Sequence, residues 1–110
     1  MATTNGNGNG NGNGKGIGRA AARLGIVGLG RAGAIHFDAA QGLASAHVAA
    51  VCDPSPAARA RAEAAGVAAY ATLDAMLAGS ALDGVVVGTP PADHADTAVR
   101  CLERGLHVLC

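Results

Sequence analysis

The sequence has few aromatic residues and no excess of charge. Its 110 residues include no tryptophan, one tyrosine and one phenylalanine, and eight basic side chains balance eight acidic ones. Two aromatic rings are too few for a base-stacking platform, and a chain of zero net charge has no field that attracts nucleic acid or an anionic membrane. We therefore expect neither nucleic acid nor a membrane among its partners.

Long apolar runs are also missing. No uninterrupted stretch reaches the length of about 18 apolar residues that a membrane-spanning helix needs. The first residues, rich in Asn and Gly, hold no apolar segment of the kind found in a secretory signal. These absences predict a cytoplasmic protein.

Cysteine is scarce, and its spacing is not that of a metal site. Cys52, Cys101 and Cys110 are an odd number without Cys-x-x-Cys spacing, and each lies in an apolar or helical run. A zinc site needs clustered ligands. We expect no metal and interpret all three as buried thiols.

The N-terminal segment has the composition of a disordered tail. Five Asn-Gly pairs fill residues 5–14, and Ile17 is the only large apolar side chain near them besides Met1. Asn-Gly is a strong hairpin signal, but a hairpin also needs alternating apolar strands on both sides, and none are present. We expect residues 1–22 to be disordered, because they bury too little surface to offset their ordering entropy.

From Arg23 onward, short apolar runs alternate with helical segments. Strands are expected at 24–28, 47–52, 67–70, 82–88 and 106–110, and helices at 30–41, 57–65, 72–78 and 92–104. Five such alternations at short spacing predict a doubly wound α/β fold, with a parallel sheet covered by helices on both faces. Since the last strand coincides with the end of the sequence, we expect the sheet to be incomplete at its C-terminal edge.

Caps and apolar stripes refine the expected helices. Ser55 before Pro56 and Thr72 are expected to cap two of them, because their hydroxyls accept hydrogen bonds from free N–H groups in the first turn. Two stripes at helical spacing are expected to face the core. They are Ala32, Ile35 and Ala39 in one helix and Ala95, Val99 and Leu102 in another.

A glycine-rich turn joins the first strand to the first helix. Gly28-Leu29-Gly30-Arg31-Ala32-Gly33 has the pattern G-x-G-x-x-G, and Asp53 follows 20 positions after Gly33 at the end of the second strand. In a dinucleotide site, the N–H groups that open the helix face the pyrophosphate, and an acidic residue about 20 positions on binds the adenosine ribose. The pattern predicts dinucleotide binding; the alternative is a structural turn with an unrelated aspartate.

Asp53 also bears on the choice of dinucleotide. A carboxylate beside the ribose repels a 2′-phosphate, so NAD is favoured over NADP. Arg59 and Arg61 in the next helix are candidates for phosphate binding, and the alternative is that they form a solvated helix face.

Four segments resemble the Gfo/Idh/MocA oxidoreductase family. Gly28–His36 is similar to the extended glycine motif, Val51-Cys-Asp-Pro54 to the second strand, and Val85–Pro90 with His94 to a Thr-Pro turn and its downstream histidine. Leu102–Val108 is similar to the stretch before a Glu-Lys-Pro motif. The resemblance implies a Rossmann domain over residues 23–110 and hydride transfer between nicotinamide and a sugar or polyol carbon.

The resemblance adds three cofactor contacts to those of the glycine turn. It places Thr89 and Pro90 beside the nicotinamide half of the cofactor, with His94 next to them; packing or helix capping is the alternative for His94. It also implies a homo-oligomer.

The family's lysine, which serves proton transfer, would follow Cys110. We therefore expect a partial Rossmann domain whose C-terminal substrate domain is absent, and no catalytic residue is assigned. A sugar or polyol substrate is expected only in a full-length protein. Two alternatives remain: a non-catalytic nucleotide-binding module, or a fragment without function.

Overall fold

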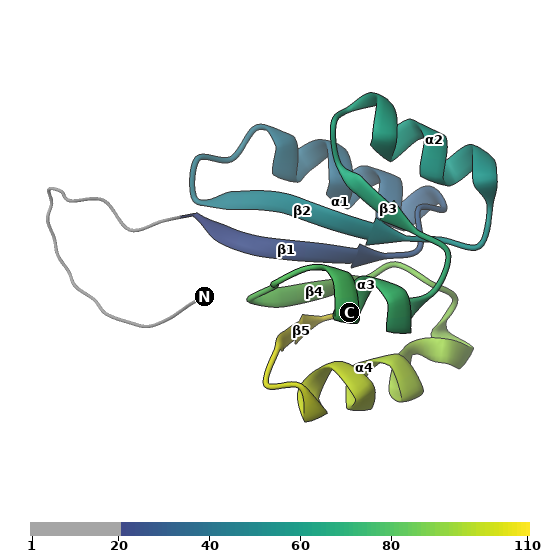
Figure 1. Cartoon of the computed structure of the whole chain (residues 1–110). Helices are drawn as coiled ribbons and strands as arrows, with labels where there is room; N and C mark the ends of the chain where they lie inside the picture. Colours follow the sequence, from purple (N-terminus) through teal and green to yellow (C-terminus); the bar gives the residue numbers. More distant parts are fainter. Residues whose placement is uncertain (1–20) are drawn as a thin grey trace, which may run out of the picture.

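The computed structural model describes residues 21–110 and shows alternating strands and helices (Figure 1). Residues 1–20, most of the expected tail, lie outside this range. The elements are β1 (Ala22–Val27), α1 (Arg31–Gln41), β2 (Ala46–Cys52), α2 (Pro56–Ala64), β3 (Ala68–Tyr70), α3 (Leu73–Gly79), β4 (Gly84–Val87), the 3-10 turn η1 (Pro91–Asp93), α4 (His94–Glu103) and β5 (His107–Leu109). Every expected strand and helix is present.

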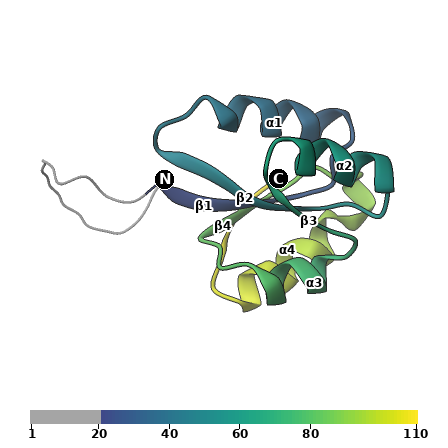
Figure 2. The same ribbon diagram turned by 45° about the horizontal axis from the view of Figure 1, so that its top comes forward.

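The five strands form one sheet in the order β3-β2-β1-β4-β5, and all neighbouring pairs are parallel. α1 and α2 cover one face, and α3 and α4 cover the other (Figure 2). This arrangement confirms the predicted doubly wound α/β fold. β1 lies at the centre, and beyond it the chain order of the strands reverses, since β2 pairs with one side of β1 and β4 with the other.

The fold begins slightly earlier than expected. Ala22, the last residue of the expected tail, already belongs to β1: it pairs with Ala46, and its N–H donates a hydrogen bond to the Ser45 carbonyl at 3.1 Å. Sheet pairing with β2 therefore moves the boundary into the predicted tail by one residue.

The core has two halves, one on each face of the sheet. Ile26 packs with Phe37 and Val51 on one side, and the next residue, Val27, packs with Met76 and Cys101 on the other. All four residues of β4 are buried. Neighbouring strand residues point to opposite faces, so a parallel sheet with two helical layers needs apolar residues at consecutive positions.

The predicted caps are confirmed. The Ser55 hydroxyl accepts a hydrogen bond from Ala58 N at 3.3 Å, and the Thr72 hydroxyl accepts one from Ala75 N at 3.1 Å. α4 begins two residues later than expected, at His94, because Pro91–Asp93 first form the 3-10 turn.

The two predicted core stripes are wrong. α1 buries Gly33, Phe37 and Ala40, and leaves Ala32, Ile35 and Ala39 exposed. α4 buries Thr97 and Cys101, whereas Val99 and Leu102 are more than half exposed. Both helices are rich in small residues and carry two faces at helical spacing, so their contact with the sheet decides which face is buried.

The cysteine prediction holds for two of three residues. Cys52 and Cys101 are buried free thiols, whereas Cys110 is exposed. Cys110 follows the last residue of β5, which is an edge strand of the sheet. Among the helices of residues 21–110, none is both long enough and apolar enough to cross a membrane.

Candidate functional site

A cleft of about 410 Å³ opens beyond the carboxyl ends of β1, β2 and β4. It lies where the strand order reverses, the usual ligand position in an open α/β sheet. Its lining residues are Val27, Gly28, Gly30, Cys52, Asp53, Pro54, Ala71, Leu73, Gly88, Thr89, Pro90 and Asp93.

The turn after β1 requires glycine at two positions. Gly28 has a φ of +86°, a conformation that side chains disfavour, and a Cβ atom on Gly33 would lie 1.8 Å from the Gly28 carbonyl oxygen. The first turn of α1 therefore packs directly on the end of β1.

Gly30 is different, because a Cβ atom there would meet no other atom of the described chain, residues 21–110, within 4 Å. It precedes α1, whose first N–H groups, those of Arg31, Ala32 and Gly33, have no acceptor within the helix. No side chain of the described residues, 21–110, caps this end, and its first turn holds no acidic residue. The open space and the free N–H groups together form an anion-binding arrangement.

Asp53 is fixed by the main chain on both sides. One carboxylate oxygen accepts a hydrogen bond from Leu29 N and the other accepts one from Ser55 N, both at 2.8 Å. The Arg59 guanidinium donates to the main-chain carbonyls of Asp53 and Pro54, both at 3.0 Å. Asp53 therefore ties the glycine turn to the start of α2, and Arg59 secures the same segment.

Thr89 forms the opposite wall. Its Cγ2 methyl lies 2.9 Å from the position that a Cβ atom on Gly28 would occupy. Its hydroxyl is buried and has no hydrogen-bond partner within residues 21–110. The Thr89 carbonyl accepts a hydrogen bond from His94 Nε2 at 2.5 Å.

The structure brings five of the ten predicted cofactor contacts to the cleft surface: Gly28, Gly30, Asp53, Thr89 and Pro90. The side chain of Leu29 packs in the core, while Arg31, Ala32 and Gly33 form the first turn of α1 beside the cleft. His94 lies behind Thr89 and is not a lining residue.

Sequence reasoning missed seven lining residues: Val27, Cys52, Pro54, Ala71, Leu73, Gly88 and Asp93. Most of them directly border a predicted strand end. The signal available was the rule that parallel strands end at one edge of the sheet, which brings the segment after β3 beside that after β2.

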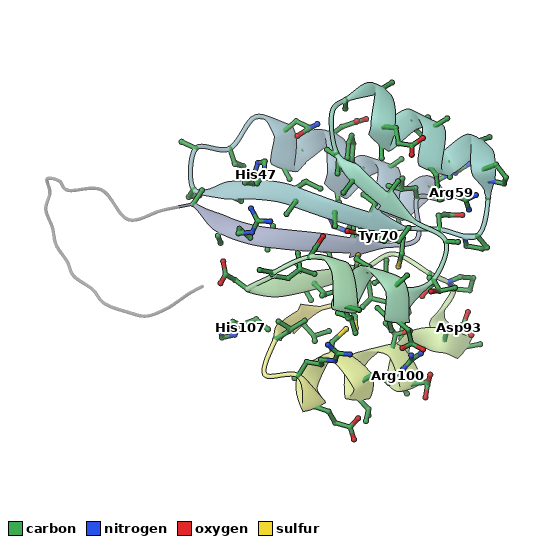
Figure 3. All side chains as sticks on the ribbon, in the orientation of Figure 1. His47, Arg59, Tyr70, Asp93, Arg100 and His107 are labelled. Carbon is green, nitrogen blue, oxygen red and sulfur yellow. The ribbon has the colours of Figure 1, made fainter. Side chains whose placement is uncertain are left out.

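In the part of the chain that the structure describes, the side chains lining the cleft include two carboxylates, of Asp53 and Asp93, and no lysine or arginine. Figure 3 shows Arg59 and Asp93 at this end of the molecule and His47 and His107 at the other. Burial, followed by the nearby Asp53 carboxylate, raises the pKa of the Cys52 thiol to about 12, so the thiol stays protonated at neutral pH. Within residues 21–110, no three His, Cys, Asp or Glu side chains group as metal ligands.

A family model and the sequences of known proteins were compared with this chain, and both place it among the same oxidoreductases. The family model GFO_IDH_MocA, described as an oxidoreductase family with an NAD-binding Rossmann fold, matches residues 22–110. The rhizopine catabolism protein MocA of Rhizobium meliloti is 40% identical over 88 residues, which are 80% of this chain and 28% of that protein. An inositol 2-dehydrogenase of Corynebacterium glutamicum is 36% identical over 91 residues, 80% of this chain and 27% of that protein.

Solved structures agree. The WlbA dehydrogenase from Bordetella pertussis, in complex with NADH and UDP-GlcNAcA, superposes with a TM-score of 0.74 at 37% identity, over 80% of this chain and 28% of that one. Apo scyllo-inositol dehydrogenase from Lactobacillus casei gives 0.75 at 31% identity, over 80% and 27%. The chain thus spans little more than a quarter of the length of these relatives. The fold, the glycine turn and the family match together show that the chain belongs to the Gfo/Idh/MocA oxidoreductase family and carries its NAD-binding Rossmann fold.

Proposed function

We propose that the cleft binds NAD, with the pyrophosphate at the start of α1. The observation that carries this proposal is the open N-terminus of α1 at Gly30, where a ligand meets free N–H groups and no side chain. The helix dipole favours negative charge at this end. Since no lysine or arginine of residues 21–110 lines the cleft, the N–H groups of Arg31, Ala32 and Gly33 supply the favourable field for the phosphates.

The two halves of NAD would then lie on either side of β1. Each Asp53 carboxylate oxygen accepts one main-chain hydrogen bond and has lone-pair capacity left for a ribose hydroxyl. On this side Asp53 binds the adenosine ribose and disfavours the 2′-phosphate of NADP. Thr89 and Pro90, after β4, border the nicotinamide half.

We also propose that the chain is the cofactor-binding part of an oxidoreductase that moves a hydride between nicotinamide and a hydroxyl-bearing carbon of a sugar or polyol. The names of its relatives, inositol 2-dehydrogenases among them, support this substrate class. The hydride chemistry belongs to the nicotinamide when it is bound. The described residues bind and orient the cofactor, and none of the lysine, histidine or tyrosine side chains in the range 21–110 lines the cleft to move a proton.

Two further proposals concern the setting of the protein. Free thiols at Cys52, Cys101 and Cys110 suit a reducing compartment, which supports a cytoplasmic location. Exposed apolar side chains at Ile35, Leu43, Val99, Leu102 and Leu109 support a homo-oligomer, because they offer apolar surface for contact between copies. Light scattering of the purified chain measures its oligomeric state and so tests the second proposal.

Isothermal titration calorimetry of the 110-residue chain with NAD and with NADP tests the cofactor assignment. We expect saturable binding of NAD and weaker binding of NADP. Thermal unfolding measured with and without NAD provides a second test, because a ligand that binds the folded state raises the midpoint of the transition. A cooperative transition that NAD leaves unchanged, with no heat of binding, would refute the assignment.

A further inference from the structure

In the turn after β4, the three consecutive residues Gly88, Thr89 and Pro90 line one wall of the cleft. On one side Gly88 N donates to the Val27 carbonyl at 2.7 Å, and on the other Asp93 N donates to the Pro90 carbonyl at 3.0 Å. Between these two bonds, the Thr89 carbonyl accepts its hydrogen bond from His94 Nε2 at 2.5 Å. The bond from His94 therefore reaches the middle of the turn.

The direction of this bond fixes the state of the imidazole. A carbonyl oxygen only accepts, so Nε2 must carry the hydrogen, in the neutral ring or in the imidazolium. His94 is the first residue of α4, and α4 is anchored by the buried residues Thr97 and Cys101. The ring thus connects an anchored helix to the turn.

The side chain of Thr89 does not secure the turn by hydrogen bonding. Its methyl group packs toward Gly28, while its buried hydroxyl finds no partner within residues 21–110. A buried hydroxyl that is left unpaired costs free energy. His94 lies outside Gly88–Pro90, and within the described range 21–110 it is the residue whose side chain hydrogen-bonds to the main chain of this turn.

We propose that His94 is a positioning residue of the cofactor cleft, acting on the dinucleotide through the Thr89 carbonyl without touching it. By holding Thr89 against the glycine turn, it keeps the wall over the β4 end of the cleft in the conformation that accepts the ligand. This inference rests on the proposed NAD site. It assigns His94 a role that differs from both a direct cofactor contact and a helix cap.

The test compares His94→Leu, which cannot donate, with His94→Gln, whose amide can. NAD affinity is measured by calorimetry on the 110-residue chain, and the melting midpoint without NAD reports folding. We expect His94→Leu to weaken NAD binding about tenfold, because the binding-competent turn becomes a minor state. Rescue by His94→Gln to within about threefold of the wild type is expected, since a donor is restored.

His107→Leu is the matched control. His107 is exposed on β5 at the end of the molecule opposite the cleft (Figure 3), so its replacement should leave NAD affinity unchanged. Equal affinity of the His94→Leu and wild-type chains would overturn the proposal. So would a His94→Gln variant that folds but binds NAD as weakly as His94→Leu.

Nitrogen-15 NMR of the imidazole gives a readout that does not depend on NAD. We expect His94 Nε2 to be protonated and Nδ1 not, in the neutral ring of the ligand-free chain. An Nδ1–H tautomer would overturn the bond to Thr89 even if NAD binds. A wild-type chain that does not bind NAD but shows the Nε2–H tautomer would refute the proposed function and leave the His94–Thr89 connection standing.

Discussion

Gly33 and Gly88 pack so closely that a Cβ atom on Gly88 would lie 2.8 Å from Gly33 Cα and 3.0 Å from the Gly28 carbonyl oxygen. This contact seats the first turn of α1 on the end of β4. Gly88 was not predicted as a site residue, yet it sets the position of the N–H groups at the start of α1.

Gly88→Ala should therefore push α1 away from the sheet. We expect a loss of about 1–3 kcal/mol in the free energy of unfolding, as in other overpacked sites, measured by urea titration. NAD affinity should fall with it. Gly42→Ala is the control, since a Cβ atom there would meet only the Ala39 carbonyl oxygen, at 3.9 Å. Equal stability of the two variants would contradict the close contact.

Gly30→Val separates binding from folding. The position has open space around it and a φ of −68°, which any residue adopts, so the variant should melt close to the wild-type temperature. The valine side chain would fill the space where the phosphates are proposed to lie. Calorimetry should detect no NAD binding. Retained affinity in the folded variant would place the phosphates elsewhere.

Asp53→Ala should lower both affinity and stability. It removes the acceptor proposed for the ribose, which we expect to cost about 1–3 kcal/mol in NAD binding, and leaves Leu29 N and Ser55 N without their carboxylate, at about 1 kcal/mol or more of folding free energy. Asp83→Ala is a matched control, because Asp83 accepts a bond from Arg23 N outside the cleft. The Asp83→Ala variant should lose stability and keep its affinity for NAD. If the Asp53→Ala variant binds NAD as tightly as the wild type, Asp53 is not part of the site.

The raised pKa of Cys52 predicts a loss of stability in alkali. The thiol titrates at about 12 in the folded chain, against an ordinary value of 9.0, so between these values the unfolded chain releases a proton that the folded chain keeps. The free energy of unfolding should fall by about 1.4 kcal/mol between pH 8 and pH 10. Urea titrations at both pH values measure this fall. In the Cys52→Ala variant, the free energy of unfolding should fall less between these pH values, by the amount assigned to Cys52. An equal fall in the two chains would contradict the raised pKa of Cys52.

Thiol reactivity should follow burial. Cys110 is exposed, whereas Cys52 and Cys101 are buried and burial raises the pKa of both thiols. At pH 8, a thiol-specific colorimetric reagent should modify one cysteine rapidly in the folded chain and three in urea. Rapid loss of two or three thiols without denaturant would show that the core opens.

The order of the elements was predictable from local signals. Ser55 and Thr72 cap helices through bonds to the N–H three positions on, and Gly28–Gly33 with Asp53 form a motif whose spacing already implies a strand, a turn and a helix. These features depend on residues close in sequence or on a fixed spacing. The fold class and three of the contacts at the cleft surface, Gly28, Gly30 and Asp53, followed from them, whereas Thr89 and Pro90 followed from the family resemblance.

Long-range contacts were not predictable in the same way. Ile35 and Phe37 are both apolar and two positions apart, and only packing on the sheet decides that Phe37 is buried while Ile35 is exposed. The bond from Leu29 N to Asp53 likewise requires β1 and β2 to be adjacent. The sequence motif identifies Leu29 and Asp53, but it does not show that the two residues are hydrogen-bonded to each other.

The position of β1 in the sheet has a kinetic consequence. Val27 pairs with Val87, which lies 60 positions later, so the central strand has its second neighbour only after most of the domain has been synthesised. Contacts this far apart in sequence slow folding, because a long loop must close before they form. The cleft, whose walls come from β1, β2 and β4, is complete only at that stage. A bound dinucleotide would therefore stabilise only chains that have finished the sheet, so it would slow unfolding and leave the rate of folding unchanged.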